Sequence, residues 1–137
     1  MTRAGRGILD TNTLILLQRL DVDSLPEEPL ITVITLAELS VGPLVTDDPK
    51  EQAARQLLLQ ETESAFEPLP LDAASARMFG RVASSLRRSG RKPAARAFDA
   101  LVASIALANQ LDVYTCNADD FKGIEGLGVV SVPHPED

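Results

Sequence analysis

The sequence predicts an α/β fold: a single-domain, three-layer sandwich in which helices cover both faces of a central, mainly parallel sheet. Short apolar or β-branched segments alternate with longer segments whose apolar residues recur at helical spacing, an order typical of parallel sheets. The 137 residues are the length of one ordinary domain. Because 45% of them are hydrophobic, the chain can bury a core without a disulfide or a metal. We therefore expect residues 1–137 to form one domain.

The first half of the chain is expected to supply two strands and three helices. In order, these are a strand at 7–9, a helix at 12–20, a strand at 30–33, a helix at 34–41 and a helix from about 47–49 to 64. Gly42 and Pro43 end the second helix. In the third helix, Ala53, Leu57 and Leu58 are expected to face inward.

The second half is expected to supply two more helices and two more strands. In order, the elements are an edge strand or extended turn at 66–71, a helix at 72–89, a helix from between 93 and 98 to about 110, and strands at 113–115 and 129–132. Pro68 and Pro70 cannot donate to a central ladder, so their segment is assigned to an edge.

The composition excludes several classes of protein. High apolar content with a net charge of only -7 argues against disorder. Cys116 is the only cysteine, which rules out a disulfide scaffold and favours a reducing compartment. No apolar run approaches the roughly 18 residues of a spanning helix, and the polar start is no signal peptide. We therefore expect a cytoplasmic protein with no membrane association.

Positive charge is concentrated in one stretch of the chain. Residues 77–96 contain seven of the 13 Lys and Arg residues and no acid, so the rest of the chain carries -14 within a total of -7. Such a stretch can steer a polyanion to one face, although a solvated helix and loop would explain it equally well. The candidate contacts are Arg87, Arg88, Arg91, Lys92 and Arg96.

Four carboxylates interrupt or closely follow apolar segments. Asp10 ends the first strand, Glu38 and Asp99 start helices beside strands, and Asp120 follows the strand at 113–115. Because the carboxyl ends of parallel strands form one edge of a sheet, these acids can converge there. Clustered carboxylates repel one another unless a cation joins them, and all-oxygen sites suit Mg²⁺ or Mn²⁺.

Each acid also has a purely structural interpretation. Asp10 can cap a helix, and Thr35 and Glu38 have the spacing of a capping box. A helix dipole can stabilise Asp99, and ordinary turn chemistry accounts for Asp120. Taken together, the four acids favour a metal site.

Four segments of the chain carry a family resemblance in their order and spacing. They are Leu9-Asp10-Thr11-Asn12, Thr35-Leu36-Ala37-Glu38-Leu39, Phe98-Asp99-Ala100-Leu101-Val102-Ala103 and Thr115-Cys116-Asn117-Ala118-Asp119-Asp120-Phe121. Together they resemble a PIN-domain ribonuclease of the VapC toxin type. The resemblance implies a PIN-like fold and an endoribonuclease that hydrolyses RNA through metal-activated water, with Mg²⁺ as cofactor and Mn²⁺ as substitute. It also implies a homodimer and a cognate antitoxin protein that occupies the active-site groove.

The resemblance also implies roles for individual residues. The catalytic and metal-binding acids would be Asp10, Glu38, Asp99 and Asp120, with Asp119 or Asn117 as the alternatives to Asp120 in the fourth position. Thr11 or Asn12 would orient these groups, and Asn117 would hold water. An Asn at position 117, where some relatives carry Asp, leaves open whether one or two metals bind. Phe121 is expected to pack in the core rather than stack on a base.

Two other functions remain open at this point. A PIN-like fold with a degenerate site would act as an interaction module, and it should show no Mn²⁺-dependent thermal shift. Residues 8–14 also resemble the first motif of haloacid-dehalogenase-type phosphatases, in which the Asp at the strand end is the nucleophile. Those enzymes carry a second Asp where this chain has Asn12.

Overall fold

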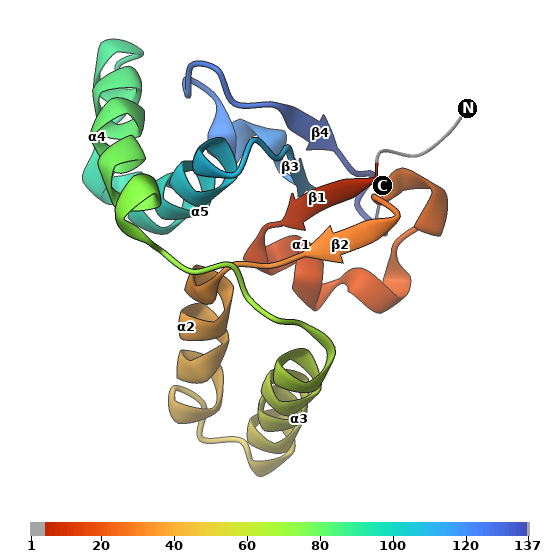
Figure 1. Cartoon of the computed structure of the whole chain (residues 1–137). Helices are drawn as coiled ribbons and strands as arrows, with labels where there is room; N and C mark the ends of the chain where they lie inside the picture. The colour runs from red at the N-terminus through yellow and green to blue at the C-terminus, as the bar shows by residue number, and fades with distance from the viewer. Residues whose placement is uncertain (1–4, 137) are drawn as a thin grey trace.

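The computed structural model describes residues 5–136 and contains a four-stranded sheet. The strands are β1 (Arg6–Leu9), β2 (Glu28–Leu30), β3 (Val113–Thr115) and β4 (Val129–Ser131), in the spatial order β2-β1-β3-β4 (Figure 1). Every neighbouring pair is parallel, which confirms the predicted α/β class with a wholly parallel sheet.

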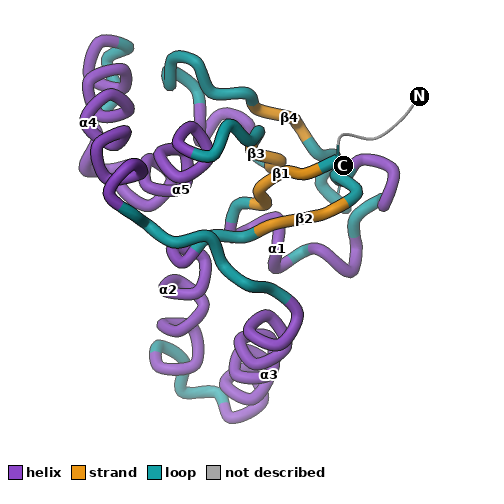
Figure 2. The backbone as a smooth tube through the Cα atoms, viewed as in Figure 1, coloured by secondary structure: helices purple, strands orange, loops and turns teal. Residues whose placement is uncertain are grey.

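Helices cover both faces of this sheet (Figure 2). They are α1 (Thr11–Ile15), α2 (Val33–Val41), α3 (Pro49–Ala65), α4 (Ala73–Arg88) and α5 (Ala97–Ala108). Because side chains alternate along a strand, Ile8 and Val113 pack in one cluster with residues of α4 and α5. Leu9 and Tyr114 face the other way and pack with Leu14 of α1 and with residues of α2. The helices α2 and α3 form a hairpin that projects from the body (Figure 1).

The second strand lies earlier in the chain than expected. The prediction of a strand at 30–33 is wrong in its bounds, because Thr32 caps α2: its Oγ1 accepts a hydrogen bond from the backbone N–H of Ile34 at 3.2 Å. The strand therefore stops at Leu30 and includes Pro29, which an edge strand tolerates.

The proline-containing segment lies at this edge, as expected. Leu69 forms an isolated parallel bridge with Thr32. Its N–H donates to the carbonyl of Ile31 at 2.9 Å, and its carbonyl accepts from Val33 N–H at 3.0 Å. The flanking Pro68 and Pro70 thus limit pairing to one residue.

Two helix predictions need correction. The helix expected at 12–20 ends at Ile15 and continues as a 3-10 turn at Leu17–Arg19. In α3, Ala53 and Leu57 are exposed rather than inward, whereas Leu58 is partly buried against the core. The projecting hairpin leaves α3 only a narrow contact face. No helix among the described residues has both the length and the apolar character needed to span a bilayer.

Gly7 in β1 is packed too closely for a larger residue. A Cβ added there would lie 2.3 Å from Cε1 of Tyr114 and 3.3 Å from Cγ of Pro26. We expect Gly7→Ala to lower the free energy of unfolding by about 1–3 kcal/mol, because overpacking forces neighbouring groups to shift. Urea denaturation checks this, with Gly5→Ala as control because a Cβ at Gly5 meets nothing within 4 Å. Equal losses in the two variants would contradict the steric explanation.

Candidate active site

Asp10 lies at the carboxyl end of β1 with only 4% of its surface exposed. Its Oδ1 accepts a hydrogen bond from the backbone N–H of Thr13 at 3.2 Å, so it caps α1. Its Oδ2 accepts from the hydroxyl of Thr115, across the sheet on β3, at 2.8 Å. Burial raises the pKa of Asp10, against the opposing effect of these hydrogen bonds. The helix-cap interpretation is therefore correct for Asp10, and the same carboxylate also lies at the sheet edge.

Glu38 does not form the capping box. Thr35 lies inside α2, with its N–H bonded to the carbonyl of Thr32. Instead, Glu38 Oε1 accepts from the hydroxyl of Thr11 on α1 at 2.7 Å. The Thr11 oxygen is also 3.0 Å from the hydroxyl of Thr35, which is fully buried. Since Thr11 gives its single proton to Glu38, Thr35 must donate to Thr11.

This hydroxyl chain makes a testable prediction about coupling. Thr35→Val removes the donor to Thr11, and Thr11→Val removes the donor to Glu38. We expect the two substitutions to be non-additive, with a coupling of about 0.5–1 kcal/mol in the free energy of unfolding. Chemical denaturation of the two single variants and the double variant measures it. Simple additivity would show that the two hydroxyls act independently.

Asp99 lies in the first turn of α5. Its pKa is raised to about 6, first by burial and then by the negative charges of Asp120, Asp10 and Glu38. The nearby Arg96 opposes this increase. Helix-dipole stabilisation alone would lower the pKa of a carboxylate at this position. Burial and repulsion therefore outweigh the dipole, and the four predicted acids are close enough to interact.

Asp120 belongs to a 3-10 turn, Ala118–Phe121, that follows β3. Its Oδ1 accepts from Arg96 Nη1 at 2.9 Å and from Asn117 Nδ2 at 3.2 Å. The backbone N–H of Asn117 in turn donates to the hydroxyl of Thr115 at 3.0 Å. Because Thr115 also donates to Asp10, it connects the first acid to the segment that carries the fourth.

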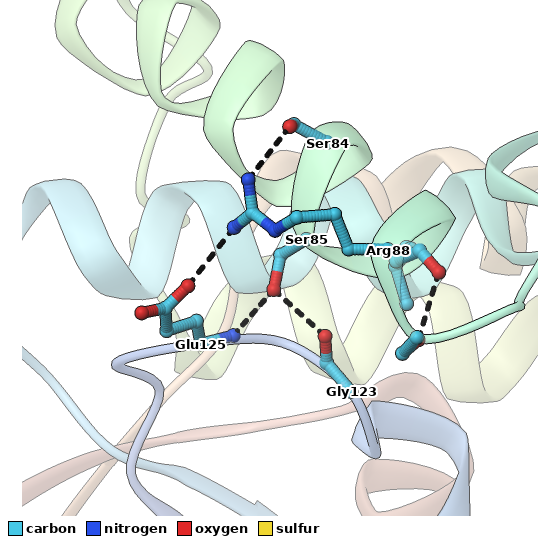
Figure 3. Close-up of polar contacts among 7 residues, drawn as sticks. Ser84, Ser85, Arg88, Gly123 and Glu125 are labelled. Carbon is cyan, nitrogen blue, oxygen red and sulfur yellow. Dashed lines mark hydrogen bonds and ion pairs between the residues drawn. The ribbon is translucent and has the colours of Figure 1, made fainter.

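The segment after this turn is fastened to α4 (Figure 3). Ser85 donates to the carbonyl of Gly123 and accepts from the N–H of Glu125, both at 2.8 Å. Arg88 pairs with the carboxylate of Glu125 at 2.9 Å and donates to Ser84 at 3.1 Å. The helix α4 therefore supports the loop that follows the turn carrying Asp120.

Three of the four acids, but not Asp10, border an open hollow of about 460 Å³. Its lining includes Asn12, Glu38, Asp99 and Asp120. Phe98 also lines it and is 57% exposed. The predicted packing residue Phe121 is buried in the core, as expected.

Carboxylate oxygens are the donors that Mg²⁺ and Mn²⁺ prefer, so the chemistry of this acid set fits such an ion. Within residues 5–136, however, no three Asp, Glu, His or Cys side chains already stand together as ligands. Asp120 is directed at Arg96 instead. Binding an ion therefore requires the carboxylates to move closer together.

The predicted polyanion contacts are distributed unevenly around the hollow. Arg96 reaches Asp120, and Arg91 donates to the backbone carbonyl of Asp119 at 3.1 Å. Arg88 is directed at Glu125 (Figure 3). Arg87 lies on α4 beside a separate hollow, and Lys92 is exposed before the 3-10 turn at Pro93–Arg96.

Sequence reasoning missed three features of the site. It did not identify Thr35 as a donor to Thr11, because the spacing of Thr35 and Glu38 indicated a capping box instead. It also missed the pairing of Arg96 with Asp120, which are 24 residues apart. The third feature is the contact between Thr115 and Asp10. The position of Thr115 at the end of a strand was the one signal in the sequence that could have indicated it.

Comparison with known proteins gives consistent matches over most of the chain. The family model for the PIN domain matches residues 8–127. Ribonuclease VapC5 of Mycobacterium tuberculosis is 35% identical over 134 residues, which cover 96% of each chain. Ribonuclease VapC4 of the same organism is 29% identical over 130 residues, 93% of this chain and 97% of the relative. The crystal structure of VapBC-5 from M. tuberculosis, a member of the VapBC family of toxin–antitoxin systems, matches with a TM-score of 0.82 at 34% identity. That match covers 93% of this chain and 99% of the solved chain.

Proposed function

The chain belongs to the PIN-domain family and is related to the VapC ribonucleases, and from this premise we propose that it is an endoribonuclease toxin with a Mg²⁺- or Mn²⁺-dependent acid site. The proposed catalytic and metal-binding residues are Asp10, Glu38, Asp99 and Asp120. The observation that supports this site is the raised pKa of Asp99, which is caused first by burial and then by the charges of the other three acids. A purely structural set of carboxylates would gain nothing from such repulsion. The family match also excludes the phosphatase alternative.

The residues around the acids have separate tasks in this proposal. Thr115 and Thr13 fix both oxygens of Asp10, and Thr11 fixes Glu38. The amides of Asn12 and Asn117 border the acids and would hold water there. A bound divalent ion supplies charge neutralisation at the scissile phosphate and a lowered pKa of water.

RNA is the proposed substrate, and its phosphates would contact the basic end of α4 and the turn that follows. The proposed contacts are Arg87, Arg88, Arg91, Lys92 and Arg96. Arg91 and Arg96 contact the segment that carries Asp119 and Asp120. This arrangement supports a path in which the RNA backbone comes closest to the protein beside these two arginines.

A cognate antitoxin is the proposed protein partner, bound in the active-site groove. An open hollow of about 490 Å³ between α1, α2 and α3 supports this location. It extends from Glu38 past Leu39 to Leu58, and Ile15 on its rim is half exposed. We further propose a homodimer in the cytoplasm, in which residues 1–137 act as one domain.

Cleavage of a structured RNA pool tests the proposed function. The purified protein is expected to cut RNA with Mg²⁺ or Mn²⁺ and to stop when EDTA is added. Asp10→Asn is the matched inactive variant, because Asn caps a helix as well as Asp does and should preserve α1. If the protein, freed of co-purified antitoxin, shows neither cleavage nor a Mn²⁺-dependent thermal shift, the degenerate interaction module becomes the better explanation.

A further inference from the structure

Arg96 places a positive charge inside the acid site. Its Nη1 lies 2.9 Å from Asp120 Oδ1, and the two side chains are 32% and 22% exposed. Arg96 also lowers the pKa of Asp99, in opposition to the three surrounding acids. It is the last residue of the 3-10 turn at Pro93–Arg96 and lies three residues before Asp99 in the chain. The same side chain thus counteracts the repulsion among the acids and holds one of them.

This contact competes directly with the proposed metal. Asp120 Oδ1 already accepts from Arg96 and from Asn117, which satisfies much of its hydrogen-bonding capacity. A divalent cation drawn to Asp120 would meet the guanidinium at close range, and two cations repel strongly where little water screens them. An ion at Asp120 would therefore weaken the contact between Arg96 and this carboxylate.

The surroundings of Arg96 offer it a second partner. Its side chain lines the same hollow as Asp99, and its neighbours there, Ala94, Ala95 and Ala97, are small. If the RNA backbone lies at this hollow, as the proposed function requires, a guanidinium released there would meet its phosphates. The planar group binds phosphate oxygens in a bidentate manner.

We propose that Arg96 is the exchangeable counter-cation of the acid site: it pairs with Asp120 in the metal-free protein and transfers to an RNA phosphate when a divalent ion takes Asp120. This inference rests on the proposed function, because it requires both the ion and the RNA. Metal loading and substrate binding are then coupled through one side chain. In the metal-free protein, Arg96 offsets part of the negative charge of the acids until both are present.

Calorimetric titration with Mn²⁺ in the absence of RNA tests the first half of the exchange. Arg96→Gln is expected to bind Mn²⁺ about two- to fivefold more tightly than the wild type, the range given by the free energy of a partly exposed ion pair. Arg77→Gln is the matched control, because it removes the same charge from α4 outside the proposed site and should leave Mn²⁺ affinity unchanged. In an Asp120→Asn background, Arg96→Gln should increase Mn²⁺ affinity by less, because the contact between Arg96 and residue 120 is already weakened.

For RNA, the exchange predicts that loss of Arg96 weakens binding, whereas for Mn²⁺ it strengthens binding. At saturating Mn²⁺, Arg96→Gln is expected to raise KM for RNA by about tenfold, because a charged hydrogen bond to phosphate is lost. Arg96→Lys keeps the charge without the planar fork, so it should retain wild-type Mn²⁺ affinity and still raise KM. Arg96→Lys also provides a test of the RNA contact if Arg96→Gln does not fold.

The outcomes separate this inference from the proposed function. A wild type that binds Mn²⁺ and cuts RNA, with Arg96→Gln binding Mn²⁺ equally or more weakly, would overturn the exchange and leave the nuclease intact. A wild type that binds no Mn²⁺ would overturn the metal site itself, and the exchange with it. Tighter Mn²⁺ binding together with a higher KM supports the exchange.

Discussion

Asp99→Asn is expected to abolish RNA cleavage and at the same time to stabilise the metal-free protein. Loss of a proposed metal ligand should reduce the cleavage rate by at least about 100-fold. Stability should rise because the variant removes a charge that burial and three neighbouring acids make unfavourable. Water reaches this side chain, so we expect a gain of about 1–2 kcal/mol at pH 7.5, below the full value implied by the raised pKa.

Two measurements check this pair of opposite effects. Cleavage is followed with Mn²⁺, and unfolding is followed in urea with EDTA present. Asp47→Asn is the control, because Asp47 is exposed in the loop before α3 and should change neither quantity. An Asp99→Asn protein that is folded and fully active would exclude Asp99 from the reaction. One that is inactive and less stable would mean that Asp99 contributes to the fold.

Mn²⁺ affinity is expected to fall steeply as the pH drops below about 6. The pKa of Asp99 is raised to about 6, so below that pH the carboxyl group holds a proton that a metal must displace. Each further pH unit should then cost about tenfold in affinity for every such proton. Titration calorimetry between pH 5 and 7.5 measures this slope. Affinity that stays constant down to pH 5 would contradict a role for Asp99 as ligand.

The raised pKa of Asp99 also determines whether the stability of the metal-free protein rises or falls with pH. The pKa of the folded state, about 6, lies above the ordinary value of 3.8, so the folded state holds more protons between these limits. The destabilisation caused by the charge of Asp99 is therefore complete above about pH 6, and it disappears as the pH falls towards 3.8. Thermal unfolding in EDTA should show the wild type gaining on Asp99→Asn as the pH falls from 7.5 to 5.

The sequence was sufficient to predict the fold class, the order of the elements and the acids that interact electrostatically. Alternating periodicities identified the parallel sheet, and β1 and β3 lie where the apolar runs predict them. The convergence of Asp10 and Asp99 follows from topology, because strand ends and helix starts meet at one edge of such a sheet. Both results follow from the periodicity of each segment and from the order of the segments along the chain.

Other features depend on contacts that local sequence does not carry. Thr35 and Glu38 have capping-box spacing, yet Thr32 is the cap and Glu38 bonds to Thr11 on another helix. The exposure of Leu57 depends on how the hairpin projects, which helical periodicity cannot specify. Arg96 is one of several similar basic residues, and its pairing with Asp120 is set by the turns that hold each residue.

The pairing of β1 with β3 has a consequence for how the protein is made. Ile8 lies opposite Val113, and Asp10 receives its hydrogen bond from a residue 105 positions later in the chain. At about 5–20 residues per second, a ribosome needs roughly 5–20 s to synthesise that interval. During this time Asp10 has neither its strand partner nor its hydroxyl donor. The growing chain therefore lacks these contacts of Asp10 until β3 has been synthesised, so this edge of the sheet is completed late.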